Sequence, residues 1–221
     1  MRHIGIDEAG RGPVLGPLVM AVVVIAPERE RYLSDAGVRD SKLFGSGNKA
    51  HLARLALKPK IEEIALAFRV VEYAASTVDD FVEKRSLDDL ERQGALRLLK
   101  EIGATTEDKI ICDGEPMFKQ LVSEWPNLLA ENRADARHIS VAAASILAKI
   151  RRDEAMHEIL ARYEPEFGKI AGGGYVNLAT RKFLEQYEAA HGTLPLEVRK
   201  SWKWRQVSPY TVDIVSMFSG K

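Results

Sequence analysis

The first third of the chain alternates between short apolar runs and breaks rich in glycine and proline. Residues 4–6 lead directly into two acids, and residues 18–25 contain four valines. A continuous apolar run of that length, bounded by glycine and proline, is typical of a buried strand. The glycine- and proline-containing segment between these two runs predicts that the strands pair antiparallel. Residues 48–57 favour a helix, and residues 66–73 favour a third strand.

Helical spacing of apolar residues dominates from residue 76 onward. Ser86 starts a sequence that resembles a capping box, and Gly103 is suited to end the helix that follows. Further segments predict strands over residues 109–112 and 128–131, a short helix over 117–122, and longer helices over 141–163 and 178–191. This order predicts an α/β domain with a mixed central sheet flanked by helices.

Composition narrows the class of protein but does not identify a partner. The 221 residues are 46% hydrophobic and 29% charged, which supports a real core and argues against disorder. Lys plus Arg equals Asp plus Glu at 32 each, so net charge neither predicts nor excludes nucleic-acid binding. The single Cys112 excludes a disulfide framework and a cysteine-based zinc site. Without a membrane-spanning run or a secretory signal, we expect a soluble, cytoplasmic protein.

Four acids stand out by their positions. Asp7 and Glu8 close the first strand, Asp113 closes a later one, and Asp135 precedes the long helix that is rich in alanine. Carboxylates gathered at strand ends are hard ligands for Mg²⁺ or Mn²⁺, and two ions about 3.5–4 Å apart can promote phosphodiester hydrolysis. Neighbours on a regular strand face opposite ways, so Asp7 and Glu8 can share one site only if the strand breaks there. Solvated turn residues or helix caps are the alternative for each acid.

Gly10, Arg11 and Gly12 form a motif that does not fit a dinucleotide-binding fingerprint. The next glycine, Gly16, is too distant, and a valine-rich strand follows where a helix should start. Glycines permit close backbone approach to a sugar-phosphate chain, and Arg11 is available to a phosphate. A tight hairpin with a surface arginine is the alternative.

Several blocks of the sequence, in family order, resemble the ribonuclease HII (type 2 ribonuclease H) family. These blocks are residues 5–13, 40–42, 113–114, 134–135 and 142–149. Residues 194–202 are further similar to the archaeal branch of the family. The resemblance implies a ribonuclease H-like fold, with a catalytic domain over residues 1–165. It also implies a C-terminal helical region over residues 166–221 that contributes to substrate binding.

The resemblance also implies the reaction. The family hydrolyses the RNA strand of RNA–DNA hybrids and incises 5′ of a ribonucleotide embedded in duplex DNA, leaving 3′-hydroxyl and 5′-phosphate ends. Its metal-binding acids map onto Asp7, Glu8, Asp113 and Asp135, which would hold two Mg²⁺ or Mn²⁺ ions with Asp7 shared between them. A junction resolvase and a non-catalytic hybrid-binding adaptor are alternatives. The glycine-arginine-glycine motif argues against the first, and the intact acids argue against the second.

Substrate-binding residues are also implied by the resemblance. The backbone of residues 10–12 would read the 2′-hydroxyl, which distinguishes RNA from DNA. Tyr175 would stack on the sugar of the following deoxynucleotide, and a buried aromatic is the alternative for this residue. Lys42 and Lys149 would contact phosphate or hold the acids in place, although an ordinary surface role is the alternative for both. Lys149 follows Ser145 by four positions, so the two share a helix face.

The C-terminal part suggests two further contacts. Residues 199–205 interleave four cations with two tryptophans, a pattern that suits a phosphate backbone or, alternatively, packed indoles with solvated charges. Thr211 to Phe218 resembles a degenerate sliding-clamp-binding peptide, and a terminal element packed on the core is the alternative. We expect a monomer that does not associate with membranes.

Overall fold

The computed structural model describes residues 1–39, 44–45 and 47–203. These residues belong to two compact units, each assembled from separate stretches of the chain. The first unit contains residues 1–9, 19–72 and 86–152, and the described part of the second contains 10–18, 73–85 and 153–203. The division at residue 165 into a catalytic domain and a C-terminal region stays a prediction.

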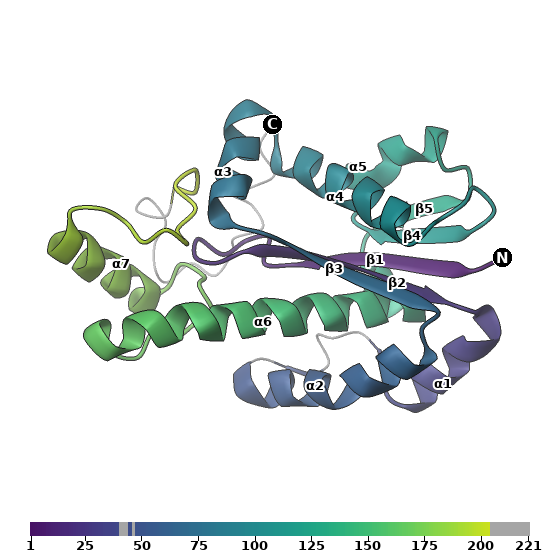
Figure 1. Ribbon diagram of the computed structural model, residues 1–221, viewed down its shortest axis with the longest axis horizontal. Helices are drawn as coiled ribbons and strands as arrows, with labels where there is room; N and C mark the ends of the chain where they lie inside the picture. The colour runs from purple at the N-terminus through teal and green to yellow at the C-terminus, as the bar shows by residue number, and fades with distance from the viewer. Residues whose placement is uncertain (40–43, 46, 204–221) are drawn as a thin grey trace. The chain divides into compact units, whose positions relative to one another are not determined.

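A five-stranded mixed sheet forms the centre of the first unit, with strand order β3-β2-β1-β4-β5 (Figure 1). Its strands are β1 (His3–Ala9), β2 (Leu18–Ile25), β3 (Ala67–Tyr73), β4 (Lys109–Asp113) and β5 (Leu128–Glu131). Strand β1 pairs antiparallel with β2 and parallel with β4, and β4 pairs parallel with β5. The predicted strands and the antiparallel first pair are therefore confirmed.

Helices cover both faces of this sheet (Figure 1). One face carries α1 (Glu30–Asp35), α2 (Gly47–Ile64) and the first part of α6 (Ile139–Phe167); the other carries α4 (Leu87–Glu101) and α5 (Glu115–Phe118). Alternate side chains of β2, including Val19 and Val23, pack with the alanines of α6 in one buried cluster. Small side chains on α6 let its axis approach the sheet closely, which matters for the site described below.

Some helix boundaries follow the sequence signals, and others differ from them. Ser86 caps α4 as predicted, because its hydroxyl accepts a hydrogen bond from the amide of Asp89 at 3.1 Å. Helix α2 runs past Pro59 to Ile64, because Ile61 and Ile64 are buried and their packing favours continuation of the helix. A short 3-10 turn, η1 (Pro27–Arg29), and helix α1 were not predicted, since their span is mostly polar and buries mainly Leu33.

The second unit contains α3 (Ala75–Lys84), the last part of α6 and α7 (Leu178–His191). Aromatic rings join the two longer helices: Tyr163 lies 5.2 Å from Phe183, and Phe167 lies 5.5 Å from Tyr187, between ring centroids. Helix α7 ends before Gly192 as predicted. Across the described ranges, we find no helix with both the length and the apolar character needed to cross a bilayer.

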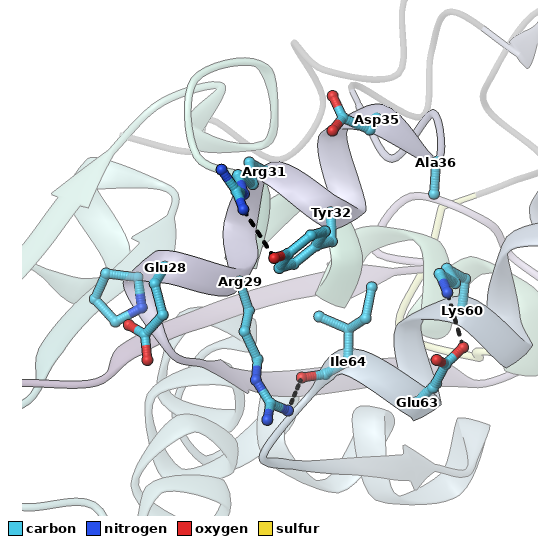
Figure 2. Close-up of a pocket in the computed structure, with 10 residues that line it drawn as sticks. Glu28, Arg29, Arg31, Tyr32, Asp35, Ala36, Lys60, Glu63 and Ile64 are labelled. Atoms are coloured by element: carbon cyan, nitrogen blue, oxygen red, sulfur yellow. Dashed lines mark hydrogen bonds and ion pairs between the residues drawn. The ribbon is translucent and has the colours of Figure 1, made fainter.

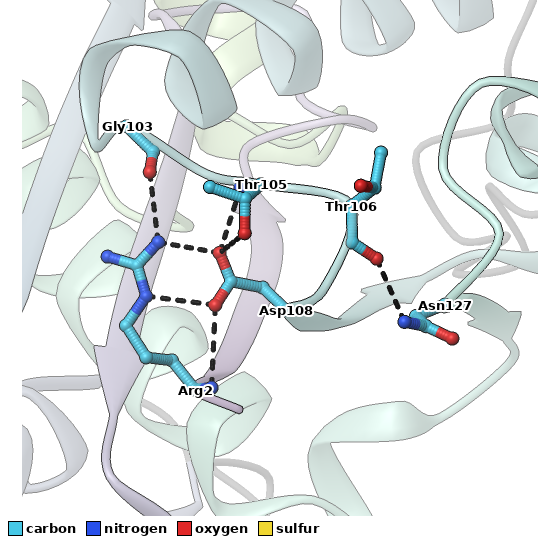
Figure 3. Close-up of polar contacts among 6 residues, drawn as sticks. All are labelled: Arg2, Gly103, Thr105, Thr106, Asp108 and Asn127. Atoms are coloured by element: carbon cyan, nitrogen blue, oxygen red, sulfur yellow. Dashed lines mark hydrogen bonds and ion pairs between the residues drawn. The ribbon is translucent and has the colours of Figure 1, made fainter.

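An ion pair fastens the start of β1 to the turn that precedes β4 (Figure 3). Arg2 donates from Nε and Nη2 to the two carboxylate oxygens of Asp108 at 2.9 and 2.6 Å, and from Nη2 to the carbonyl of Gly103 at 2.9 Å. The amide of Thr105 also donates to Asp108. The hydrogen bonds from Arg2 are the largest cause that lowers the pKa of Asp108 to about 2.

We expect Asp108→Asn to lower the free energy of unfolding by about 1–2 kcal/mol at pH 7. A carboxyl whose pKa is depressed by folding stabilises the native state above its unfolded pKa, and that contribution disappears as the pH falls through the folded pKa. The deficit should therefore persist at pH 5–7 and shrink between pH 3.8 and about 2. Urea unfolding at several pH values measures it, with the exposed Asp35→Asn as control. A deficit independent of pH would contradict this explanation.

Candidate active site

Three of the four predicted acids converge in the first unit. Carboxylate oxygens of Asp7, Asp113 and Asp135 all lie within 4.8 Å of one another. Asp7 lies on β1, Asp113 ends the adjacent parallel strand β4, and Asp135 lies in the short 3-10 helix η4 (Ala134–Ala136) that precedes α6. Parallel neighbours present their carboxyl ends at the same sheet edge, which explains how side chains distant in sequence meet. We call these three residues the carboxylate group.

Backbone contacts hold the carboxylate group in place. The amide of Ala134 donates to Asp113 Oδ1 at 3.2 Å, which ties η4 to the end of β4. The amide of Glu8 donates to Asp7 Oδ1 at 2.8 Å. After β5, the Glu131 carboxylate accepts hydrogen bonds from Arg137, at 2.7 Å, and from His138. The segment between β5 and α6, which carries Asp135, is thus held by hydrogen bonds both before and after this residue.

Helix α6 contributes two polar side chains to the surroundings of Asp7. Burial raises the pKa of Asp7 to about 6, while the charge of Lys149 and a hydrogen bond from Ser145 oppose that rise. The charge of Asp113 adds to it. Lys149 Nζ also donates to Ser145 Oγ at 2.7 Å, so the two residues act from one helix face. The pairing of Ser145 with Lys149 at a spacing of four is the sequence signal for this arrangement.

The close approach of α6 depends on Gly5 in β1. A Cβ atom at Gly5 would lie 2.1 Å from the carbonyl carbon of Ser140 and 2.3 Å from the amide nitrogen of Val141. Only glycine therefore allows the first turn of α6 to sit against the strand. Since Ser145 and Lys149 follow on the same helix, this contact sets their distance from Asp7.

The donor set fits a divalent cation. All three ligand atoms are carboxylate oxygens, the hard donors that Mg²⁺ and Mn²⁺ prefer. Asp7 and Asp135 are only 4% and 2% exposed, and mutual repulsion of buried carboxylates is unfavourable unless a positive charge compensates it. A cation bound here could also hold a phosphate oxygen.

Glu8 does not join the carboxylate group within the described part of the chain. Strand β1 stays regular through Ala9, with Asp7 opposite Ala21 and Glu8 opposite Met20, so the break considered for this point does not occur. Burial raises the pKa of Cys112, and the charges of Glu8, Asp113 and Asp7 add to that rise. Glu8 thus contributes to the same anionic surroundings, and its role as a ligand stays a prediction.

The loop predicted to read the substrate lies in the second unit, together with Tyr175. The amides of Val14 and Leu15, just after the loop, donate to the carbonyl of Gly174 at 3.0 and 3.1 Å. Tyr175 is 42% exposed, so the alternative of a buried aromatic is wrong. Residues 10–12 are half-buried. Their binding roles stay predictions, as does that of Lys42, which lies outside the described residues together with Asp40 and Ser41.

The basic C-terminal cluster needs a correction. Arg199 is completely buried and Trp202 is 6% exposed, so neither is presented to a phosphate backbone. Lys200 and Lys203 are exposed. The rest of the predicted cluster, residues 204–205, lies outside the described residues. Sequence reasoning missed the inward role of Arg199; the adjacent apolar Val198 and Trp202 were the available signal.

A separate hollow of about 1300 Å³ lies between η1, α1 and the end of α2 (Figure 2). Its three cations already have partners: Arg29 donates to the carbonyl of Ile64, Arg31 to the hydroxyl of Tyr32, and Lys60 to Glu63. It contains no member of the carboxylate group. We therefore assign the chemistry to the carboxylate group and not to this hollow.

We expect Ser145→Ala to weaken binding of Mn²⁺ to the carboxylate group by about tenfold, because residues that orient a ligand contribute to affinity without touching the metal. Calorimetric titration of the metal-free protein measures the effect. Ser34→Ala, at an exposed position on α1, is the matched control. An unchanged affinity in Ser145→Ala would show that Asp7 is positioned without this hydroxyl.

Solved structures share this architecture over almost the whole chain. The ribonuclease H2 from Pyrococcus horikoshii OT3 superposes with a TM-score of 0.79 at 28% identity, covering 99% of both chains. Ribonuclease HII in the PCNA:RNase HII complex from Archaeoglobus fulgidus gives a TM-score of 0.76 at 28% identity, covering 94% of this chain and 98% of that one. The fold and the carboxylate group together define a metal-dependent nuclease with a ribonuclease H-like fold.

The sequence comparison narrows this class. The ribonuclease HII family model matches residues 4–205. Ribonuclease HII of Thermococcus sibiricus is 36% identical over 211 residues, which covers 92% of this chain and 89% of the relative. The chain belongs to the ribonuclease HII family. It is accordingly an endonuclease with ribonuclease H activity on RNA–DNA hybrids, and the implied family and fold are confirmed.

Proposed function

We propose that this ribonuclease also incises duplex DNA 5′ of a single embedded ribonucleotide, leaving 3′-hydroxyl and 5′-phosphate ends. The observation that carries the proposal is the convergence of Asp7, Asp113 and Asp135 within 4.8 Å. We propose Glu8 as the fourth ligand and Asp7 as the carboxylate shared by two Mg²⁺ or Mn²⁺ ions. Such ions, when bound, activate a water and stabilise the leaving oxygen of the phosphodiester.

The chain's own residues have a positioning task in this scheme. Ser145 and Lys149 favour the ionised form of Asp7, because both oppose the effect of burial on its pKa. The amide of Ala134 orients Asp113. An ionised, fixed carboxylate can bind a cation without first losing a proton, which favours ligand binding near neutral pH.

Recognition of the ribonucleotide is proposed for the second unit. The backbone of Gly10, Arg11 and Gly12 contacts the 2′-hydroxyl, and the exposed ring of Tyr175 stacks on the following deoxyribose. The hydrogen bonds from Val14 and Leu15 to Gly174 support this assignment, because they join the two segments. Arg11, Lys42 and Lys149 are proposed phosphate contacts. In this scheme residues 166–221 contribute to substrate binding, and residues 1–165 carry the catalysis.

End-labelled cleavage mapping tests the proposal directly. The substrate is a DNA duplex with one ribonucleotide, compared with an RNA–DNA hybrid and an all-DNA duplex, in Mg²⁺, Mn²⁺ or a chelator. We expect a cut 5′ of the ribonucleotide that requires metal, and no cut in all-DNA. Cleavage of hybrid alone would reject ribonucleotide incision, and cleavage of all-DNA junctions would favour a resolvase. Metal binding without any cleavage would favour a non-catalytic adaptor.

A second, independent proposal concerns a sliding clamp. The Archaeoglobus fulgidus relative was solved in a complex described as PCNA:RNase HII. We propose that Thr211 to Phe218, which lie outside the described residues, bind a sliding clamp. Calorimetry of the full chain, and of a chain ending at residue 210, against a PCNA ring tests this; equal affinity for both would reject it. Light scattering of the same samples tests the proposed monomeric state.

A further inference from the structure

Arg199 is a buried cation whose hydrogen bonds go to the backbone of the substrate-reading loop. Its Nη2 donates to the carbonyl of Gly10 at 2.6 Å, Nη1 to the carbonyl of Arg11 at 3.0 Å, and Nε to the carbonyl of Gly16 at 3.1 Å. The side chain has no exposed surface. A buried guanidinium is tolerated only when its donors are satisfied, and three main-chain oxygens here satisfy donors at all three nitrogens.

Trp202 completes the set of carbonyl contacts. Its indole Nε1 donates to the carbonyl of Gly12 at 3.2 Å, and the guanidinium carbon of Arg199 lies 5.1 Å from the indole ring centroid. The carbonyls of three consecutive loop residues, Gly10, Arg11 and Gly12, therefore all accept hydrogen bonds from the segment that contains Arg199 and Trp202.

This segment is itself anchored to the rest of the second unit. The amide of Arg199 donates to the carbonyl of Val14 at 2.8 Å. On α3, the Asp79 carboxylate accepts hydrogen bonds from the amides of Lys200 and Ser201 at 2.8 and 3.0 Å. The guanidinium thus projects from a fixed backbone, which lets it impose a conformation on the loop instead of following it.

The direction of the loop amides follows from peptide geometry. The described backbone contains no cis peptide bond, and in a trans peptide the C=O and N–H groups point in opposite directions. When the carbonyls of Gly10 and Arg11 point at the guanidinium, the N–H groups of Arg11 and Gly12, in the same peptide planes, point away from it. Two successive amide donors are thereby directed to the side of the loop opposite Arg199.

We propose that Arg199 is a positioning residue for substrate recognition: by holding the carbonyls of the loop, it orients the Arg11 and Gly12 amides for the ribose 2′-hydroxyl. Trp202 supports it through Gly12. The inference rests on the proposed role of the loop in substrate recognition. It identifies the Arg199 guanidinium and the Trp202 indole as the groups that hold the loop in its conformation. Arg199 itself touches no substrate, since the loop lies between them in this scheme.

Conservative variants distinguish a role of Arg199 in orienting the loop from a role in folding alone. Arg199→Lys keeps the positive charge but loses the planar fork that reaches three carbonyls. Trp202→Phe keeps a smaller aromatic ring and removes the indole donor to Gly12. Arg162→Lys is the matched control, because Arg162 is a 60% exposed arginine of the same unit whose guanidinium pairs with the side chain of Glu197.

Two readouts on the full-length protein test the proposal. In substrate-free protein, we expect exchange of the hydrogen-bonded amides of Val14, Leu15 and Gly16, which directly follow the loop, to accelerate about tenfold in Arg199→Lys and measurably in Trp202→Phe. In steady-state cleavage well below the unfolding temperature, we expect KM for an RNA–DNA hybrid to rise about tenfold in Arg199→Lys with little change in kcat. Mn²⁺ affinity should stay at the wild-type value, and Arg162→Lys should match wild type throughout.

The outcomes separate this proposal from the proposed function. Unchanged amide exchange of residues 14–16 in both variants, or faster exchange with an unchanged KM for hybrids, overturns the role of Arg199. If wild-type protein fails to cut at a single ribonucleotide, the proposed incision activity fails, while exchange and hybrid kinetics still decide the role of Arg199. Should Arg199→Lys not fold, the same two measurements on Trp202→Phe decide it, because loss of one neutral donor leaves the buried charge in place.

Discussion

Replacing Asp7 by asparagine is expected to lower kcat on an RNA–DNA hybrid by about a thousandfold or more. An amide is a poor ligand for a hard divalent cation. Asp7 is a buried residue of strand β1, and its carboxylate belongs to the carboxylate group, whose oxygens lie within 4.8 Å of one another. Single-turnover cleavage at saturating Mg²⁺ measures the loss. Asp113→Asn is expected to behave similarly, because Asp113 belongs to the same group.

The same variant should leave the fold intact. Burial raises the pKa of Asp7 to about 6, so ionisation of this carboxyl near neutral pH lowers the stability of the metal-free fold relative to the unfolded chain. Metal-free Asp7→Asn is therefore expected to unfold at the same temperature as wild type or higher. Asp35→Asn, on the exposed end of α1, is the matched control and should retain full activity. Full activity in both Asp7→Asn and Asp113→Asn would remove the carboxylate group from the mechanism.

Gly5→Ala is expected to cause the second large effect, a loss of about 3 kcal/mol or more in the free energy of unfolding. The added methyl group would lie 2.1 Å from a backbone carbon of Ser140, and backbone atoms cannot rotate away as a side chain can. The first turn of α6 must move outward, which also displaces Ser145 from Asp7. We therefore expect weaker Mn²⁺ binding in any folded fraction. Urea unfolding and calorimetry provide the two measurements.

Gly37→Ala is the control for this substitution. Its added methyl group meets no atom within 4 Å, and its only penalty is the left-handed backbone, with φ of 97°. That penalty is about 1–2 kcal/mol, and we expect no displacement of the carboxylate group from it. Equal destabilisation by both substitutions, with Mn²⁺ affinity unchanged, would show that the contact between Gly5 and Ser140 does not position α6.

The sequence predicted the elements whose pattern is set by local chemistry. Apolar runs defined β1, β2 and β4, and the acids that end these runs marked Asp7 and Asp113 as neighbours once the sheet was assumed. The N-cap of α4 at Ser86 and the end of α7 before Gly192 could also be predicted, because each depends only on residues a few positions apart. Asp135 was singled out by its position just before the alanine-rich helix, since nothing in its own segment indicates a strand end.

What could not be predicted depends on contacts between distant residues. Arg199 has the sequence surroundings of a surface cation, with lysines nearby, and only the structure shows that its donors reach residues 10, 11 and 16. Likewise, the continuation of α2 past Pro59 depends on burial of Ile61, which a residue-by-residue signal cannot supply. For Glu8, by contrast, a local rule was sufficient. Neighbouring residues on a regular strand face opposite ways, which argued against one site for both Asp7 and Glu8, and the pairing of β1 with β2 is regular through Ala9.

The bond between Arg199 and Gly10 joins residues 189 positions apart, close to the full length of the chain. Bringing two such distant residues together costs more conformational entropy than closing a short loop. We therefore expect the contact to form late, after local helices and hairpins. During synthesis residues 10–12 emerge well before Arg199, so they acquire their final shape only after that later segment is available. A nascent chain is therefore expected to assemble its acids before residues 10–12 are ordered, so that under the proposed role of these residues substrate selectivity develops after the metal-binding group.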